Sequence, residues 1–160
     1  MEGIRLSIEI VLVEPEIPQN TGNIVRTCAA TSIKLHLVEP LGFSIDEKHV
    51  KRAGLDYWHL VEIETHKSLQ DFLQKYESNR RLFYATTKAK NHYAQINYVP
   101  GDMILFGKET KGLPEKLLFA KPERCVRLPM ESGARSLNLS NAVAVFSYES
   151  LRQLNFPGLR

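Results

Sequence analysis

The chain has 160 residues and a formal net charge of +3, from 21 basic and 18 acidic residues. Its composition, 43% hydrophobic and 24% charged, is typical of a globular protein and excludes a low-complexity chain. The length predicts a single domain spanning residues 1–160, with no added RNA-binding domain. The small basic surplus fits a nucleic-acid partner but does not require one.

The cysteines and histidines form no recognisable framework. Cys28 and Cys125 fit neither a disulfide pattern nor a metal motif, and neither H-x-x-x-H nor C-x-x-C occurs, so we predict no metal site. The apolar stretch near the amino terminus is short and broken by Glu9, which argues against a signal peptide. No segment approaches the length of a membrane span. These features predict a cytoplasmic protein with no membrane partner.

Strand-like and helix-like patterns alternate along the chain. Short apolar runs predict strands at residues 8–13, 34–39, 61–64, 81–86, 103–106 and 124–128. Helices are predicted at residues 22–31, 46–52, 69–76 after the capping Ser68, 117–119 after Pro114, and 138–154. Prolines exclude a regular element over residues 14–19, and residues 88–100 are expected to be a polar connection. The alternation predicts an α/β fold, a mainly parallel sheet with helices on both faces.

Three polar segments that lie far apart in the chain follow predicted strands. They are residues 20–26 (NTGNIVR), residues 106–114 (FGKETKGLP), and residues 128–141, where LPM is followed by RSLNLSN. Ligands of open α/β sheets bind at the carboxyl ends of the strands. We therefore expect the three segments to form one site.

The second and third segments do not match common nucleotide or nucleophile motifs. Gly112 is followed by Leu-Pro rather than Lys-Ser or Lys-Thr, which excludes a P-loop, and no G-x-G-x-x-G follows the first strand. No G-x-S-x-G surrounds Ser136 or Ser140. A cofactor held mainly by backbone groups at glycine turns is the remaining interpretation. The alternatives are helix capping for Ser136 and Asn138 and an ordinary strand-end turn for Gly107.

The same segments resemble the motifs of the SPOUT superfamily of methyltransferases, and within it the small enzymes that methylate the tRNA wobble nucleotide. The resemblance rests on residues 14–23, on Leu-Asp-Tyr at 55–57 after Arg52, on residues 106–114 and on residues 136–141. It implies a fold with a C-terminal trefoil knot, S-adenosylmethionine as the methyl donor and a homodimer. The implied reaction methylates the ribose 2′-hydroxyl of cytidine or modified uridine at the wobble position in the tRNA anticodon loop.

The resemblance also assigns site residues. Arg26, Asn20 and Ser140 are expected at the reaction centre, with Asn23 and Asn138 on the acceptor side. The positions expected to contact the cofactor are Ala85, Thr86, Gly107, Glu109, Gly112, Leu128, Met130, Ser136 and Leu137. A guanidinium stays protonated, so Arg26 is expected to orient a phosphate or the acceptor hydroxyl. Its alternative role is a salt bridge on the first helix.

Surface features suggest how RNA and a second subunit would bind. The basic residues expected to face RNA, with Tyr148 near the site, are Lys48, Lys51, Arg52, Lys88, Lys90, Lys108 and Lys111. The last helix has a broad apolar face, so the first and last helices are expected to form the dimer interface, with Val143 as a candidate contact. Two other functions stay open: 2′-O-methylation at another tRNA or rRNA position, and RNA binding without catalysis.

Overall fold

The computed structural model describes residues 6–46, 48, 52 and 57–160. Within them lies a seven-stranded sheet in the order β3-β2-β1-β6-β4-β7-β5, in which every pairing is parallel. The strands are β1 (Glu9–Val13), β2 (Leu35–Val38), β3 (Ile63–His66), β4 (Leu82–Ala85), β5 (Asn91–His92), β6 (Met103–Phe106) and β7 (Cys125–Arg127). The α-helices are α1 (Pro18–Thr31), α3 (Leu69–Tyr76), α4 (Glu115–Ala120) and α5 (Leu139–Gln153). The described part of the chain contains no helix with the length and apolarity that a membrane crossing needs.

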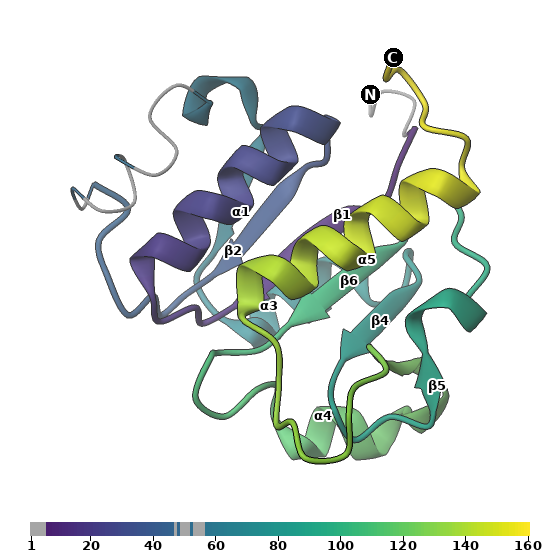
Figure 1. The fold of residues 1–160 in the computed structure, drawn as a ribbon. Helices are drawn as coiled ribbons and strands as arrows, with labels where there is room; N and C mark the ends of the chain where they lie inside the picture. The colour runs from purple at the N-terminus through teal and green to yellow at the C-terminus, as the bar shows by residue number, and fades with distance from the viewer. Residues whose placement is uncertain (1–5, 47, 49–51, 53–56) are drawn as a thin grey trace.

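Helices cover both faces of the sheet. Helices α1 and α5 lie side by side across one face (Figure 1). There Ile10 packs in the same buried cluster as Ile24 of α1 and Phe146 of α5. Its neighbour Val11 points to the opposite face and packs with Phe72 of α3, since successive side chains of a strand alternate. Burial on both faces explains why the central strands β1, β6 and β4 are almost continuous apolar runs, EIVLV, MILF and LFYA.

The structure confirms the predicted α/β class and the predicted parallel sheet. Each of the six predicted strands overlaps an observed one, although β3 begins at Ile63 rather than at residue 61. Ser68 caps α3 as predicted, because its Oγ accepts a hydrogen bond from the Asp71 backbone N–H at 3.0 Å. The trefoil knot stays a prediction.

Two predicted boundaries are wrong, and one prediction falls outside the described residues. Helix α1 begins at Pro18 rather than at residue 22, because the fixed φ of proline suits the first helical position, where no N–H is needed. Residues 88–100 are not only a connection, since they contain β5 and a 3-10 turn at Tyr93–Gln95. Most of the helix predicted at 46–52 lies outside the described residues.

A buried polar cluster crosses the sheet beneath α3. The Nε2 atom of His36 lies 2.6 Å from Glu9 Oε1, and its Nδ1 lies 3.0 Å from His66 Nε2. Arg80 Nη1 donates to Glu9 Oε2 at 2.7 Å, and His66 Nε2 lies 3.2 Å from Glu64 Oε2. Such groups can be buried because each has hydrogen-bond partners. Burial, with the adjacent His36, lowers the pKa of His66 below its ordinary value.

We expect the free energy of unfolding to fall as the pH is lowered from 7 to 5. The unfolded chain, in which a histidine has a pKa of about 6.5, binds a proton more readily than the folded His66 does. The stability from neutral His66 is therefore present above about pH 6.5 and is lost below it. Urea unfolding at a series of pH values measures how steeply the free energy of unfolding depends on pH, and His66→Gln should reduce this slope. His59→Gln, at an exposed position, should keep it. Equal slopes for His66→Gln and the wild type would contradict the prediction.

Candidate functional site

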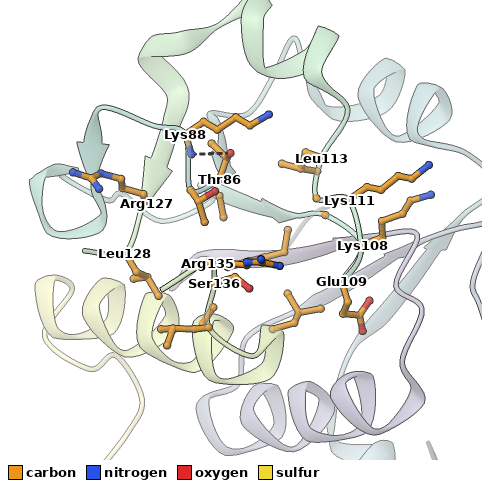
Figure 2. A pocket seen from close by; sticks show the side chains of 18 of the residues that line it. Thr86, Lys88, Lys108, Glu109, Lys111, Leu113, Arg127, Leu128, Arg135 and Ser136 are labelled. Carbon is orange, nitrogen blue, oxygen red and sulfur yellow. Dashed lines mark hydrogen bonds between the residues drawn. The ribbon is translucent and has the colours of Figure 1, made fainter. Parts of the chain in front are cut away.

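A cavity of about 530 Å³ lies at the carboxyl ends of β4, β6 and β7. This volume is within the usual range for small-molecule sites. Its walls come from residues 106–113, from residues 126–128, 130 and 135–139, and from residues 85–88, with Ile17 and Asn20 beside them. Figure 2 shows side chains of these wall segments around the cavity. The fold thus brings residues of all three polar segments to one cavity, as the sequence predicted.

The second segment forms a tight loop that requires a glycine at position 107. The Gly112 N–H donates to the Lys108 carbonyl at 2.8 Å, and the two residues form an isolated β-bridge. A Cβ atom on Gly107 would lie 2.0 Å from the Gly112 carbonyl carbon and 2.1 Å from the Leu113 nitrogen. Gly112 itself has a φ of +72°, which favours glycine. The loop can therefore close in this way only if residue 107 lacks a side chain, and the backbone at residue 112 favours glycine.

The carboxylate of Glu109 holds the beginning of α1. Its Oε1 accepts a hydrogen bond from the Glu16 backbone N–H at 2.8 Å, and its Oε2 accepts from the Ile17 N–H at 3.0 Å and from Asn20 Nδ2 at 3.1 Å. The N–H groups at a helix start lack partners within the helix and carry partial positive charge, so a carboxylate suits them. Glu109 therefore fixes Asn20 and α1 against the cavity loop.

A second set of hydrogen bonds joins α5 to the same place. Asn20 Oδ1 accepts from Asn138 Nδ2 at 3.1 Å, and Asn138 Oδ1 accepts from the Ser140 N–H at 2.9 Å and from Ser140 Oγ at 2.6 Å. The capping interpretation of Asn138 is confirmed, and Asn138 rather than Ser136 is the N-cap of α5. A continuous chain of hydrogen bonds thus runs from Glu109 through Asn20 to the start of α5.

Glu16, which lies just before α1, also contacts the cavity loop. Its Oε1 accepts hydrogen bonds from the Thr110 N–H at 3.0 Å and from Thr110 Oγ1 at 2.8 Å. These bonds to Thr110 lower the pKa of the Glu16 carboxyl. Glu16 and Glu109 therefore hold α1 and the loop together reciprocally, each accepting from the other's backbone segment.

The structure places every predicted cofactor position at the cavity, but it divides the predicted reaction centre. The cavity wall includes Ala85, Thr86, Gly107, Glu109, Gly112, Leu128, Met130, Ser136 and Leu137. Asn20 lines the cavity as well. Ser140 and Arg26 do not line the cavity. The Ser140 Oγ atom donates to Asn138 at the start of α5, and Arg26 is exposed on α1.

Arg26 has an aromatic neighbour rather than an acidic one. Its Cζ lies 4.9 Å from the centre of the Tyr57 ring. Among the described residues it forms no ion pair, so the alternative of a salt bridge on the first helix is not seen there. Of the resemblance at 55–57, Leu55 and Asp56 lie outside the described residues.

Basic side chains surround the cavity. Figure 2 shows Lys88, Lys108 and Lys111 at its edge, as expected for residues facing RNA. It also shows Arg127 and Arg135, which the sequence reasoning did not assign. Two features of the sequence could have indicated them: Arg127 lies near the end of the last predicted strand, and Arg135 begins the RSLN motif. Lys51 lies outside the described residues, and the described Lys48, Arg52 and Lys90 do not line the cavity.

One group of side chains has the residue types and spacing of possible metal ligands, although the sequence predicted no metal site. Potential ligand atoms of His36, Glu64 and His66 lie within 4.8 Å of one another. No sequence motif revealed this group, because neighbouring strands rather than adjacent residues bring it together. Its members hydrogen-bond to one another and to lysines, which explains their proximity without an ion. The absence of a metal stays a prediction.

Comparison with known proteins gives consistent matches over nearly the whole chain. The SpoU rRNA Methylase family matches residues 7–148. The tRNA (cytidine(34)-2′-O)-methyltransferase of Escherichia coli strain K12 is 49% identical over 152 residues, covering 94% of this chain and 96% of that protein. The protein of the same name from Yersinia pestis is 49% identical over 156 residues, with the same coverage.

Solved structures match equally well. One from a study of "the 2-OH methylation of C/U34 on tRNA" has a TM-score of 0.88 and 42% identity, and the match covers 92% of this chain and 96% of that one. The SpoU methyltransferase AviRb from Streptomyces viridochromogenes, in complex with the cofactor AdoMet, shares the fold with a TM-score of 0.84 and 20% identity. That match covers 94% of this chain and 62% of that one.

We expect Gly107→Ala to destabilise the protein by about 1–3 kcal/mol, the usual cost of forcing extra atoms into a packed place. The added Cβ would overlap backbone at Gly112 and Leu113, which cannot rotate away. Gly133→Ala is the matched control, since a Cβ there meets nothing within 4 Å. Urea unfolding of both variants measures the difference. Equal stability of the two variants would show that the loop closes in another way.

Proposed function

Because the chain belongs to the SpoU methylase family, we propose that it transfers a methyl group from S-adenosylmethionine to the ribose 2′-hydroxyl of nucleotide 34 in tRNA. The observation that carries the proposal is the 49% identity, over 94% of this chain, to the E. coli tRNA (cytidine(34)-2′-O)-methyltransferase. The cavity supports it, since all the positions assigned to the cofactor line the same cavity. We further propose that residues 1–160 act as one catalytic domain.

The cavity fits S-adenosylmethionine in its size and in the chemistry of its walls. Leu113 and Leu128 are buried and supply apolar surface, against which a purine can pack. Gly107 and Gly112 line the cavity, and since glycine has no side chain, their main-chain groups form part of its wall. When bound, the cofactor supplies an activated methyl group on sulfur. The protein supplies the alignment, which in favourable cases is worth about 7–11 kcal/mol.

The acceptor side is assigned to Asn20 and Arg26. Glu109 and Asn138 fix the Asn20 amide from both ends, so Asn20 can present a hydrogen-bonding group without reorganising. Arg26 stays protonated and would hold a phosphate or the acceptor ribose rather than remove a proton. Lys88, Lys108 and Lys111 would attract the anticodon loop to the cavity edge.

Arg26 lies outside the cavity of its own chain, and we propose that a homodimer brings it to the partner's cavity. Helices α1 and α5 lie side by side on one face of the sheet (Figure 1). On α5, Val145 and Tyr148 are 40% and 48% exposed. A twofold interface would bury these side chains and place each Arg26 near the other subunit. Val143 is fully buried in the core of its own subunit, so the expectation that it is a contact is corrected.

We expect the protein to methylate tRNA and Arg26→Ala to lower the single-turnover rate by at least about a hundredfold, which corresponds to about 2.7 kcal/mol. The affinity for S-adenosylmethionine, measured by calorimetry, should stay within about twofold, since Arg26 is proposed to act on the acceptor RNA rather than on the cofactor. Arg152→Ala, which removes an exposed arginine paired with Glu149, is the matched control and should keep the rate.

A modified substrate tests whether the methyl group goes to the 2′-hydroxyl of nucleotide 34. A tRNA carrying a 2′-deoxy nucleotide at position 34 should accept no methyl group. Methylation of that tRNA would favour the alternative of another position, and cofactor binding without methylation of any tRNA would contradict the proposed function. An Arg26→Ala rate within tenfold of wild type would remove Arg26 from the mechanism.

We expect Val145→Asp to dissociate the dimer and to abolish methylation, because it would place a carboxylate in an apolar contact. Phe119→Asp is the matched control, since Phe119 is 73% exposed on α4, a helix on the other face of the sheet. Sedimentation velocity at micromolar concentration measures the assembly of both variants. A wild-type monomer that methylates tRNA at the full rate would refute the dimer.

A further inference from the structure

The Arg26 side chain stacks on an aromatic ring that belongs to another segment of the chain. Its Cζ lies 4.9 Å from the centre of the Tyr57 ring, a distance typical of a cation–π contact. We infer that Tyr57 is a positioning residue for Arg26. This inference rests on the proposed function, in which Arg26 reaches the acceptor RNA.

The ring of Tyr57 has a fixed support. Tyr57 is the first residue before the 3-10 turn η1 (Trp58–Leu60), and its carbonyl accepts a hydrogen bond from the Leu60 N–H at 2.9 Å. The next residue, Trp58, packs against the buried cluster beneath α1 and α5. The turn therefore holds the Tyr57 ring next to the outer face of α1, where Arg26 projects.

The stack leaves the hydrogen-bonding capacity of the guanidinium free. A ring can lie against the flat face of the guanidinium, whereas the five N–H donors lie in the plane of the group and point outward. A carboxylate partner would occupy those donors and cancel the charge, but the described residues supply none to Arg26. The stacked Arg26 is thus restricted in its rotamers and can still bind a phosphate through two parallel hydrogen bonds.

The contact depends on the ring of Tyr57 and not on its hydroxyl. No hydrogen bond of the Tyr57 hydroxyl occurs among the described residues, and the ring is what lies beneath the guanidinium. Phenylalanine at this position would keep the face of the ring, and leucine would remove it. The pair Tyr57→Phe and Tyr57→Leu therefore separates stacking from other effects.

The first measurement is the single-turnover methylation rate at saturating tRNA, with the cofactor affinity determined by calorimetry. We expect Tyr57→Leu to lower the rate about tenfold or more while cofactor affinity stays within twofold, and Tyr57→Phe to stay within twofold in both. In an Arg26→Ala background, Tyr57→Leu should change the rate by less than twofold, because the group it positions is gone. A Tyr57→Leu protein at the full rate, or one equally slowed in the Arg26→Ala background, would overturn the inference.

A second measurement does not depend on catalysis. In the wild type, the side-chain NMR resonances of Arg26 should show the upfield shift that an aromatic ring causes in groups above its face. Tyr57→Phe should keep this shift, and Tyr57→Met, which also serves if Tyr57→Leu does not fold, should remove it. An Arg26 spectrum identical in the wild type and Tyr57→Met would refute the stack. Failure of the proposed function is distinguishable, because it would appear as a wild type that does not methylate tRNA.

Discussion

The carboxylate of Glu109 is the group on which the arrangement of the site depends. It accepts three hydrogen bonds from the start of α1, two from backbone N–H groups and one from the Asn20 amide. Asn20 in turn accepts from Asn138, which caps α5. A single anion therefore joins a loop after β6 to helices that begin near opposite ends of the chain. The positions of Asn20 and of the α5 start follow from it.

The same arrangement explains why the cavity contains so little conventional catalytic chemistry. The loop from Gly107 to Gly112 folds tightly back on itself, and the side-chain Oδ1 of Asn138 is occupied, because it caps α5 and also accepts from the Ser140 hydroxyl. A reaction whose methyl group arrives already activated needs alignment more than it needs a strong base. A rigid cradle of main-chain groups and fixed amides supplies alignment.

The charged groups of the protein have two separate roles. Beneath α3, Glu9, His36 and Arg80 are buried and satisfy one another, so they contribute to a specific sheet packing. Around the cavity, Lys88 pairs with Glu115 at 2.9 Å and Lys108 with Glu14 at 3.6 Å. On α1, Arg26 is exposed and lies against a ring instead of an acid. Among the described residues, no acid pairs with Arg26, so its charge is available to RNA.

The sequence by itself determined the α/β class and six of the seven strands, because apolar runs specify buried strands. It also indicated that the polar segments meet, because parallel strands end at one edge, whereas the individual cofactor positions came from a family resemblance. Only the tertiary structure decided that α1 begins at Pro18, that Glu109 holds it, that Arg26 lies outside the cavity on Tyr57, and that Val143 is buried. Local patterns report which residues prefer a strand, a turn or a cap. They do not report which distant side chain meets them, since those contacts depend on how the strands are ordered in the sheet.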